Sequence, residues 1–369
     1  MRITNVTLRL FSWNGIPPTS YGVHTGAPVQ ESKLGLLAIE TSEGLTGHAF
    51  LGSVSFPADI DGPSLIRFLK PLLIGQDPLN RERIYRSLWA RARNTSVRAI
   101  GAVDIALWDL AGKIAGLPIH QLIGTSRERI PAYASSQVLE GPEAYAEEAL
   151  RFKELGWHAY KIHPRQKWKE DIQACEAVRK AVGDDFTLML DSTWAYQYGD
   201  ALRVGLALQD MNYYWYEDPL AEQDLYNYTK LREKLHIPIM ATEYPAASLE
   251  SYAPWITGRA TDFLRGDVAV KGGITNLLKI AHLAEAFHMN LEVHHGGNSL
   301  NNLANLHVIM AIRNTEFFEI LLPDAAQKYG MVNDIVVDQE GYVNTPNGPG
   351  LGGEIDFKLI NDCSVGILS

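Results

Sequence analysis

The sequence has few cysteines and no excess of basic residues, and both absences limit what the protein can be. Its 369 residues include only Cys175 and Cys363, which lie far apart and match no metal-binding or redox spacing. This usage suits a reducing compartment and requires no disulfide framework. The chain has 43 acidic and 33 basic residues, for a net charge of −10, which disfavours nucleic acid or an anionic membrane as partner. The net charge does not exclude a small anionic substrate, because binding of a small ion depends on the local charge at its site.

Long apolar runs are also missing from the sequence. No segment reaches the roughly 18 consecutive apolar residues of a membrane span, and the opening MRITNVTLRLFSW alternates like a strand, unlike a signal peptide. We therefore expect no membrane contact and a cytoplasmic location. Apolar residues make up 46% and charged residues 21% of the chain, which is ordinary for a globular protein with a large core. The length favours two domains.

Residues 1–128 predict an α+β domain, in which strand-like segments precede helices near 63–73, 78–94 and 96–115. Between the first two strands, residues 11–30 are rich in Gly and Pro and carry Trp13, Tyr21 and His24. Such a long loop is either an active-site lid or a well-packed surface loop. The tail, about 340–369, is turn-rich and then strand-like, so we expect it to complete this domain.

In residues 129–339, short apolar segments alternate with helical ones. The strand candidates are IPAYASS, HAYKIH, TLMLDS, YWYED, IMATE, FLRGDV, NLEVHH and FFEIL. The helical stretches between them are 142–155, 169–182, 200–210, 224–236, 248–258, 274–288 and roughly 300–313. This alternation predicts an α/β fold with parallel strands joined by crossovers, and its natural closed form is a barrel.

Polar side chains stand at the ends of these strands, where the chemistry of such barrels takes place. Asp191, Glu217 and Glu243 end three consecutive strand candidates. Converging carboxylates repel one another unless a cation lies among them. Oxygen-only ligands on a rigid frame suit Mg²⁺, with positions left for substrate and water. Any one of these acids alone could be a helix cap or a solvated loop residue, but three at matching places favour a metal site.

Nitrogen bases end other strands of the predicted barrel. Lys161 and His163 are two residues apart, so in an extended segment they share a face, either in solvent or in an active site. Asp267 and His294 end neighbouring strands, where the carboxylate can fix the imidazole tautomer and leave one nitrogen free for proton transfer. His295 is an alternative partner of Asp267. Alternation along the strand favours His294.

With these motifs in order, the chain resembles the enolase superfamily, specifically its mandelate racemase subgroup, over essentially the whole length. AIGAVDIALWDLAGKIAGLPIHQLIG (99–124) resembles that subgroup's first signature, and LMLDSTWAY followed by YWYEDPL resembles the second, with Asp191 and Glu217 as metal ligands. DVAVKGGIT (267–275) matches its Asp and Gly-Gly arrangement, where the muconate-lactonizing subgroup has a lysine. EFFEI matches the eighth strand, which ends in Glu319.

The resemblance implies a (β/α)7β TIM-like barrel, residues 129–339, under an N-terminal α+β capping domain. It also implies one Mg²⁺ per subunit, a homo-oligomer (dimer or octamer), and cover of the site by the 11–30 loop and residues 48–56. Two departures concern the bases. The subgroup often has Lys-x-Lys on the second strand, where this chain has Lys161-Ile162-His163, and its Asp-x-Asn is here Asp191-Ser192-Thr193.

The reaction step shared by this family is removal of the proton α to a carboxylate, and the negative charge that develops must be stabilised. We expect Lys161 beside the substrate carboxylate, His163 and His294 on opposite faces of the α-carbon, and Glu319 as a hydrogen-bond donor if it is protonated. The predicted activity is dehydration of a sugar acid to a 2-keto-3-deoxy acid, with His163 as base and His294 as acid, or the reverse. Racemisation or epimerisation of a 2-hydroxy acid by the same residues is the alternative. The candidates for substrate contact are Trp13, Tyr21, His24, Arg165, Trp194, His295 and Asn298.

Overall fold

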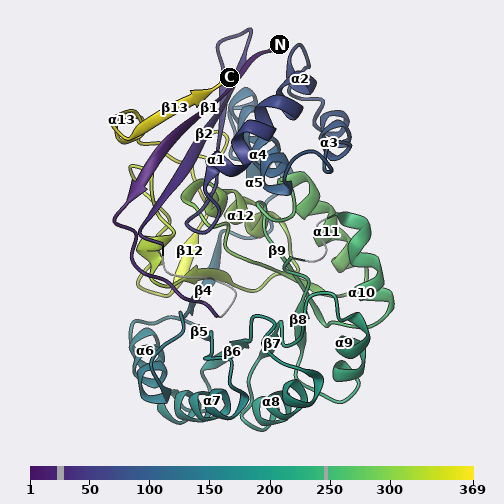
Figure 1. Ribbon diagram of the computed structural model, residues 1–369, viewed down its shortest axis with the longest axis vertical. Coiled ribbons are helices and arrows are strands. Elements are labelled where there is room, and N and C mark those ends of the chain that lie inside the picture. Colours follow the sequence, from purple (N-terminus) through teal and green to yellow (C-terminus); the bar gives the residue numbers. More distant parts are fainter. Residues whose placement is uncertain (23–28, 245–247) are drawn as a thin grey trace.

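The structure, a computed structural model, describes residues 1–22, 29–244 and 248–369. An antiparallel sheet with helices forms one end of the molecule, and a barrel of parallel strands surrounded by helices forms the other (Figure 1). In these described ranges, no helix is both long and apolar enough to cross a membrane.

The cap is built on a four-stranded antiparallel sheet that joins the two ends of the chain. Its strands, in spatial order, are β13 (Ser364–Leu368), β1 (Ile3–Asn14), β2 (Glu31–Thr41) and β3 (Thr46–Leu51). The tail therefore returns to the first sheet as expected, although its last strand begins later than the pattern indicated. Phe357–Asp362 forms helix α13, because the Asp356 side chain caps it by accepting a hydrogen bond from Leu359 N (2.9 Å).

Helices pack on this sheet and carry the chain to the barrel. They are α1 (Ala58–Ser64), the π-helical turn η2 (Leu65–Leu69), α2 (Lys70–Leu73), α3 (Arg81–Trp89), α4 (Val97–Ala115) and α5 (Ile119–Ile123). The predicted long helix is α4, which begins at a Ser96 cap and ends at Gly116 with φ 69°. Residues 99–112 of α4 are buried on all faces, because the helix lies between the cap sheet and the barrel.

The eight predicted barrel strands all form and run parallel. In chain order they are β4 (Arg129–Ser135), β5 (Ala159–Ile162), β6 (Thr187–Asp191), β7 (Trp215–Glu217), β8 (Ile239–Ala241), β9 (Phe263–Gly266), β10 (Asn290–Val293) and β11 (Phe318–Leu321). Their spatial order, β10-β9-β8-β7-β6-β5-β4-β11, makes a nearly closed barrel. This confirms the predicted fold class.

The crossover helices cover the outside of the barrel (Figure 1). They are α6 (Pro142–Glu154), α7 (Trp168–Val182), α8 (Tyr198–Asp210), α9 (Leu225–Arg232), the 3₁₀ turn η3 (Leu249–Tyr252) with α10 (Ala253–Thr257), α11 (Ile274–Ala286) and α12 (Ser299–Ala311). After β11 follow the short turn η4 (Asp324–Ala326) and β12 (Tyr342–Asn344), which pairs antiparallel with β4. The tail thus contacts both sheets, and the domain boundaries near 128 and 339 stay a prediction.

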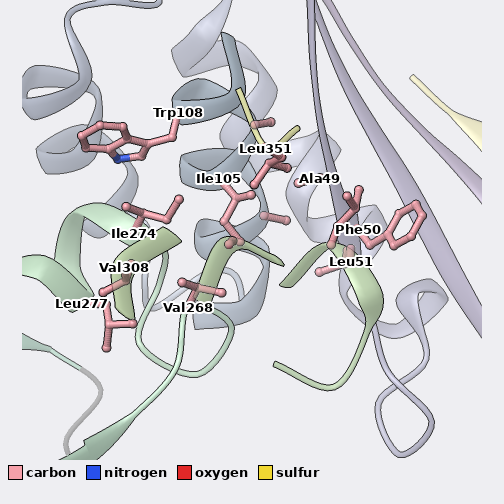
Figure 2. Close-up of a cluster of buried hydrophobic side chains, with 14 of the residues drawn as sticks. Ala49, Phe50, Leu51, Ile105, Trp108, Val268, Ile274, Leu277, Val308 and Leu351 are labelled. Carbon is pink, nitrogen blue, oxygen red and sulfur yellow. The ribbon is translucent and has the colours of Figure 1, made fainter. Parts of the chain in front are cut away.

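The cap is fastened to the barrel where α4 meets the loop between β9 and α11. Ile105 and Trp108 of α4 face Val268 and Ile274 in one apolar cluster (Figure 2). Trp108 Nε1 donates to Thr275 Oγ1 (2.9 Å). A side chain at Gly273, where φ is 107°, would put its Cβ 2.4 Å from the Asp104 Cβ. The Gly-Gly pair is therefore needed for close packing of this loop.

Asp104 is the buried polar group of this junction, and it makes the junction sensitive to pH. Its Oδ2 accepts from Thr275 N (2.8 Å) and its Oδ1 from Thr275 Oγ1 (2.7 Å). Burial raises the pKa of Asp104 to about 6, against the smaller lowering effect of these bonds. An acid whose pKa is higher in the folded state destabilises that state as pH rises from the unfolded pKa through the folded one.

We expect Asp104→Asn to remove this pH-dependent loss of stability. A shift from 3.8 to about 6 corresponds to about 3 kcal/mol. The free energy of unfolding of the wild type should therefore fall relative to D104N by about that amount between roughly pH 3.5 and pH 7.5. Urea titrations across this range measure the difference, and parallel pH profiles of the two proteins would contradict the assignment.

Candidate active site

A cavity of about 490 Å³ lies between the cap and the carboxyl ends of the barrel strands. The cap contributes residues 50–56, Tyr21 and Arg98 to its wall. The barrel contributes His163, Asp191, Glu243, Asp267, His294 and Glu319, each from a different strand unit. Glu319 is the second residue of β11, so the expectation that the eighth strand ends there is wrong. Six of the predicted residues therefore face one common space, whereas Lys161 and Glu217 are not among its described wall residues.

Three carboxylates meet at the base of this cavity. Asp191 and Glu217 are the last residues of β6 and β7, and Glu243 follows β8 by two residues. One oxygen of each lies within 4.8 Å of the others, and all three side chains are buried. Two oxygens bound to one Mg²⁺ at about 2.1 Å are at most about 4.2 Å apart, so small rotations would bring all three to one ion.

The electrostatics of the cluster also fit a bound cation. Burial, and then the charges of Asp191 and Glu217, raise the pKa of Glu243 to about 7, although His294 and Arg265 oppose the shift. Asp218 is buried beside them, and burial followed by the charge of Glu243 raises its pKa well above the ordinary value. Such crowding of buried acids is relieved by a divalent cation. The residues present therefore suit Mg²⁺.

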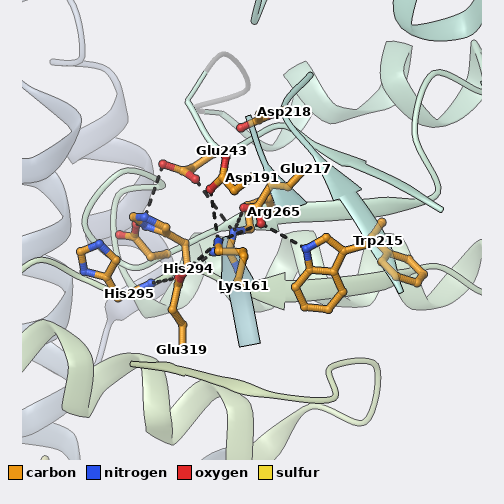
Figure 3. Close-up of polar contacts among 12 residues, drawn as sticks. Lys161, Asp191, Trp215, Glu217, Asp218, Glu243, Arg265, His294, His295 and Glu319 are labelled. Carbon is orange, nitrogen blue, oxygen red and sulfur yellow. Dashed lines mark hydrogen bonds and ion pairs between the residues drawn. The ribbon is translucent and has the colours of Figure 1, made fainter. Parts of the chain in front are cut away.

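Two buried cations already lie beneath these carboxylates (Figure 3). Lys161 Nζ, on β5, lies 3.2 Å from Asp191 Oδ2, 2.8 Å from Glu217 Oε2 and 2.9 Å from Glu319 Oε1. Arg265, on β9, places Nε 2.7 Å from Glu217 Oε1 and Nη2 2.6 Å from Glu319 Oε2. Both side chains are fully buried, so each charge is balanced by carboxylates within the barrel.

Arg265 was missed in the sequence analysis, although a signal for it existed. It stands two residues before Asp267 in the strand candidate FLRGDV, so alternation puts both on one face. An arginine on an inward face requires buried acids opposite it. Glu217 and Glu319 supply them.

Glu319 is ionised in this arrangement. Burial alone would raise its pKa, but Arg265 and Lys161 hold the pKa well below the ordinary value. Its Oε2 also accepts a hydrogen bond from His295 N (3.2 Å). Glu319 was expected to donate a hydrogen bond only if it is protonated. As a carboxylate it accepts hydrogen bonds instead.

His163 lies on the Asp191 side of the cluster. Its Nδ1 is 2.6 Å from the backbone oxygen of Ser136, which can only accept, so Nδ1 carries the proton. Its Nε2 points toward Asp191 Oδ2, at 3.1 Å. With Nδ1–H held there, Nε2 is the ring nitrogen that faces the cavity, beside Asp191. The loop after β4 fixes this tautomer.

His294 lies on the opposite side, against Glu243. Its Nδ1 donates to Asp267 Oδ2 (2.6 Å), and its Nε2 is 3.4 Å from Glu243 Oε1. Asp267 is itself held by the backbone N–H groups of Ala269 and Val270. Burial lowers the pKa of His294, but Glu243 and Asp267 outweigh it, and the net pKa is raised.

His295 has different partners from His294. Its Nδ1 accepts from Gly297 N (3.1 Å), and burial followed by the charge of His294 lowers its pKa well below the ordinary value. The structure therefore pairs Asp267 with His294, the member of the two histidines that alternation favoured.

The predicted substrate contacts divide into three groups. Tyr21, Trp194 and His295 line the cavity, and the Tyr21 ring lies 5.4 Å from that of His163. His24 lies outside the described residues. Trp13, Arg165 and Asn298 are not among the described residues of the cavity wall.

These three residues have other partners. Trp13 belongs to β1, not to the loop, and stacks on Tyr329 at 5.1 Å in the core. Arg165 Nη1 donates to the Glu140 carbonyl (2.6 Å). Asn298 caps α12 and donates to Gly52 O (2.8 Å), so it fixes the cap loop against the barrel.

Comparisons with known proteins agree with this fold and site. Residues 4–124 match the family "Mandelate racemase / muconate lactonizing enzyme, N-terminal domain", and residues 144–359 match "Enolase C-terminal domain-like". The chain therefore belongs to the mandelate racemase and muconate lactonizing enzyme family of the enolase superfamily. The resemblance to the mandelate racemase subgroup is confirmed.

Several relatives of this chain are named as acid sugar dehydratases. An L-talarate/galactarate dehydratase of Salmonella typhimurium is 32% identical, over 72% of this chain and 70% of its own length. An arabinonate dehydratase of Saccharolobus solfataricus is 28% identical, over 85% of this chain and 86% of its own. The crystal structure of a D-glucarate dehydratase from Agrobacterium tumefaciens complexed with magnesium is 34% identical, with TM-score 0.88 over 99% of this chain and 100% of the other.

If the carboxylate cluster is a metal site, Mg²⁺ should bind once per chain and stabilise the fold. Glu243→Gln should weaken that binding by about tenfold or more, because a neutral amide replaces one anionic ligand. Isothermal titration calorimetry and the Mg²⁺-dependent rise in melting temperature measure it. Glu292→Gln, which alters another buried carboxylate, is the control and should bind like the wild type. Equal affinity in E243Q would argue against the site.

Arg265 should be essential for stability, because its removal would leave Lys161 to balance the buried Glu217 and Glu319 carboxylates alone. We expect Arg265→Met to lower the free energy of unfolding by about 3–5 kcal/mol. The double variant Arg265→Met, Glu319→Gln should recover part of that loss, because it also removes one of the two buried negative charges. Chemical denaturation of the three proteins tests the idea. It fails if R265M is as stable as the wild type.

Proposed function

We propose that the protein is a Mg²⁺-dependent dehydratase of a sugar acid, a hydro-lyase that gives a 2-keto-3-deoxy acid. The observation that carries the proposal is the pair of histidines on two sides of the carboxylate cluster, each with Nδ1 fixed and Nε2 directed inward. The names of the relatives support the substrate class. A cytoplasmic location and a homo-oligomer, dimer or octamer, remain part of the proposal.

The substrate carboxylate would bind at the cluster. A Mg²⁺ ion held by Asp191, Glu217 and Glu243 would supply Lewis-acid stabilisation of the charge that develops there. Lys161 adds a fixed positive charge at the same place, and Arg265 keeps Glu217 and Glu319 in position. These groups are arranged before the reaction, so little reorganisation is needed as charge develops.

His163 would remove the α-proton. The Ser136 carbonyl holds its Nδ1–H, so Nε2, on the cavity side beside Asp191, would be the nitrogen that takes the proton. His294 would then protonate the departing β-hydroxyl, which leaves as water. Asp267 stabilises the imidazolium form of His294 and fixes its orientation. The resulting enol rearranges to the 2-keto-3-deoxy acid.

Racemisation or epimerisation of a 2-hydroxy acid is the second candidate, because the same two-sided arrangement supports it. In that reaction His294 would return a proton to the α-carbon on the opposite face, and nothing would leave from the β-carbon. The two reactions are distinguished by their products, a 2-keto-3-deoxy acid in one case and the stereoisomer of the substrate in the other.

The proposal is tested by incubating the enzyme with Mg²⁺ and a panel of acid sugars in D₂O. We expect a 2-keto-3-deoxy product for at least one acid, and a loss of about 10²–10⁴-fold in kcat for His163→Asn and for His294→Asn. H294N should still exchange the α-proton for deuterium, because the base remains. H163N should not.

The exposed His236 provides the control, and His236→Asn should keep full activity. Deuterium at the α-carbon with inverted stereochemistry and no keto product would reject dehydration in favour of the second candidate. Full activity in both histidine variants would reject either use of this site.

A further inference from the structure

Arg98 reaches the same cavity from the cap. It is the second residue of α4, and its side chain is about a quarter exposed (27%). Arg98 and Tyr244 both line this cavity.

Two neighbours hold the guanidinium in one orientation. Arg98 Nε donates to Asp61 Oδ2 (3.1 Å), and the Cζ atom lies 4.1 Å from the centre of the Phe56 ring. Phe56 is held in turn by backbone hydrogen bonds with Ser53. Only Nε is engaged with Asp61. The Nη1 and Nη2 groups have no hydrogen-bond partner among the described residues.

A guanidinium held at Nε can still bind a carboxylate through its two Nη groups. Planar, bidentate pairing with a carboxylate is the contact for which arginine is best suited. Stacking on an aromatic ring restrains its rotation and reduces the entropy lost on binding. The Arg98 fork is therefore preorganised.

Arg98 is also the cation that the cap contributes to the described part of the cavity wall. Among the described residues of the cavity wall it is the one lysine or arginine, and the stretches 23–28 and 245–247 contain neither residue type. Lys161 and Arg265 belong to the barrel strands, where buried carboxylates already surround them. Among the described wall residues, Arg98 is therefore the lysine or arginine that a substrate group extending from the carboxylate cluster toward the cap would meet.

We propose that Arg98 binds a second, distal carboxylate of the substrate, so that the preferred sugar acid is a diacid. This inference rests on the proposed function, because it assumes that the first carboxylate binds at the cluster of Asp191, Glu217 and Glu243. The substrate then spans the cavity between two cationic anchors. Asp61 and Phe56 are positioning residues for Arg98.

The test compares a hexarate with the aldonate of the same configuration, for example D-glucarate with D-gluconate, and includes their epimers. We expect the diacid to have the higher kcat/KM. Arg98→Met should raise KM for the diacid roughly 10- to 100-fold, as expected for a lost charge-assisted hydrogen-bond pair, and change KM for the monoacid by less than about threefold. Arg98→Lys should recover part of the loss.

Arg81→Met is the matched control, since Arg81 also stacks on an aromatic ring, 4.0 Å from the Trp108 centre, but outside this cavity. R81M should not change the ratio of diacid to monoacid KM. Melting temperatures show whether either variant is misfolded. Affinity for adipate, a six-carbon dicarboxylate with no hydroxyl group to eliminate, measured by calorimetry with Mg²⁺, reports on Arg98 without turnover.

The outcomes separate the two proposals. Equal effects of R98M on both acids, or a preference for the monoacid, would overturn the role of Arg98 and leave the dehydratase proposal standing. If no acid is dehydrated but adipate binding still depends on Arg98, the dehydratase proposal fails and the anion site survives.

Discussion

The balance of charge inside the barrel is the constraint on which the site depends. Asp191, Glu217 and Glu319 are buried with Lys161 and Arg265. Carboxylates in such surroundings persist only when cations or hydrogen bonds compensate their lost hydration. The two side-chain cations compensate one side of the cluster. The other side, around Glu243 and Asp218, stays crowded with acid, and this is where a divalent ion would complete the balance.

The position of the bases follows from the same frame. The strands fix the Cα atoms, and backbone groups fix the side chains: the Ser136 carbonyl orients His163, and the N–H groups of Ala269 and Val270 orient Asp267. Asp267 in turn orients His294. The cap then closes the cavity over these groups, because α4 is fastened to the loop that follows Asp267. The cap and the barrel therefore both contribute to the wall of one cavity.

Much of this frame could be predicted from the sequence, because its signals are local. Strand alternation and regular spacing placed Asp191, Glu217, Glu243 and Asp267 at strand ends facing one mouth. Other features depend on contacts between distant segments. The ionised state of Glu319 requires Arg265 and Lys161 from two other strands, and the tautomer of His163 requires a carbonyl from the preceding unit. Trp13 was assigned to the loop although it shares a face of β1 with Phe11, both buried, so alternation continued further than we supposed.

The claim that carboxylates from three neighbouring strands share one divalent ion is tested most directly by anomalous diffraction from crystals soaked in Mn²⁺, a substitute for Mg²⁺. The account predicts one anomalous peak per chain, about 2 Å from one oxygen each of Asp191, Glu217 and Glu243. A peak elsewhere, or a cavity in which Lys161 keeps its contacts and no ion binds at saturating Mn²⁺, would contradict it.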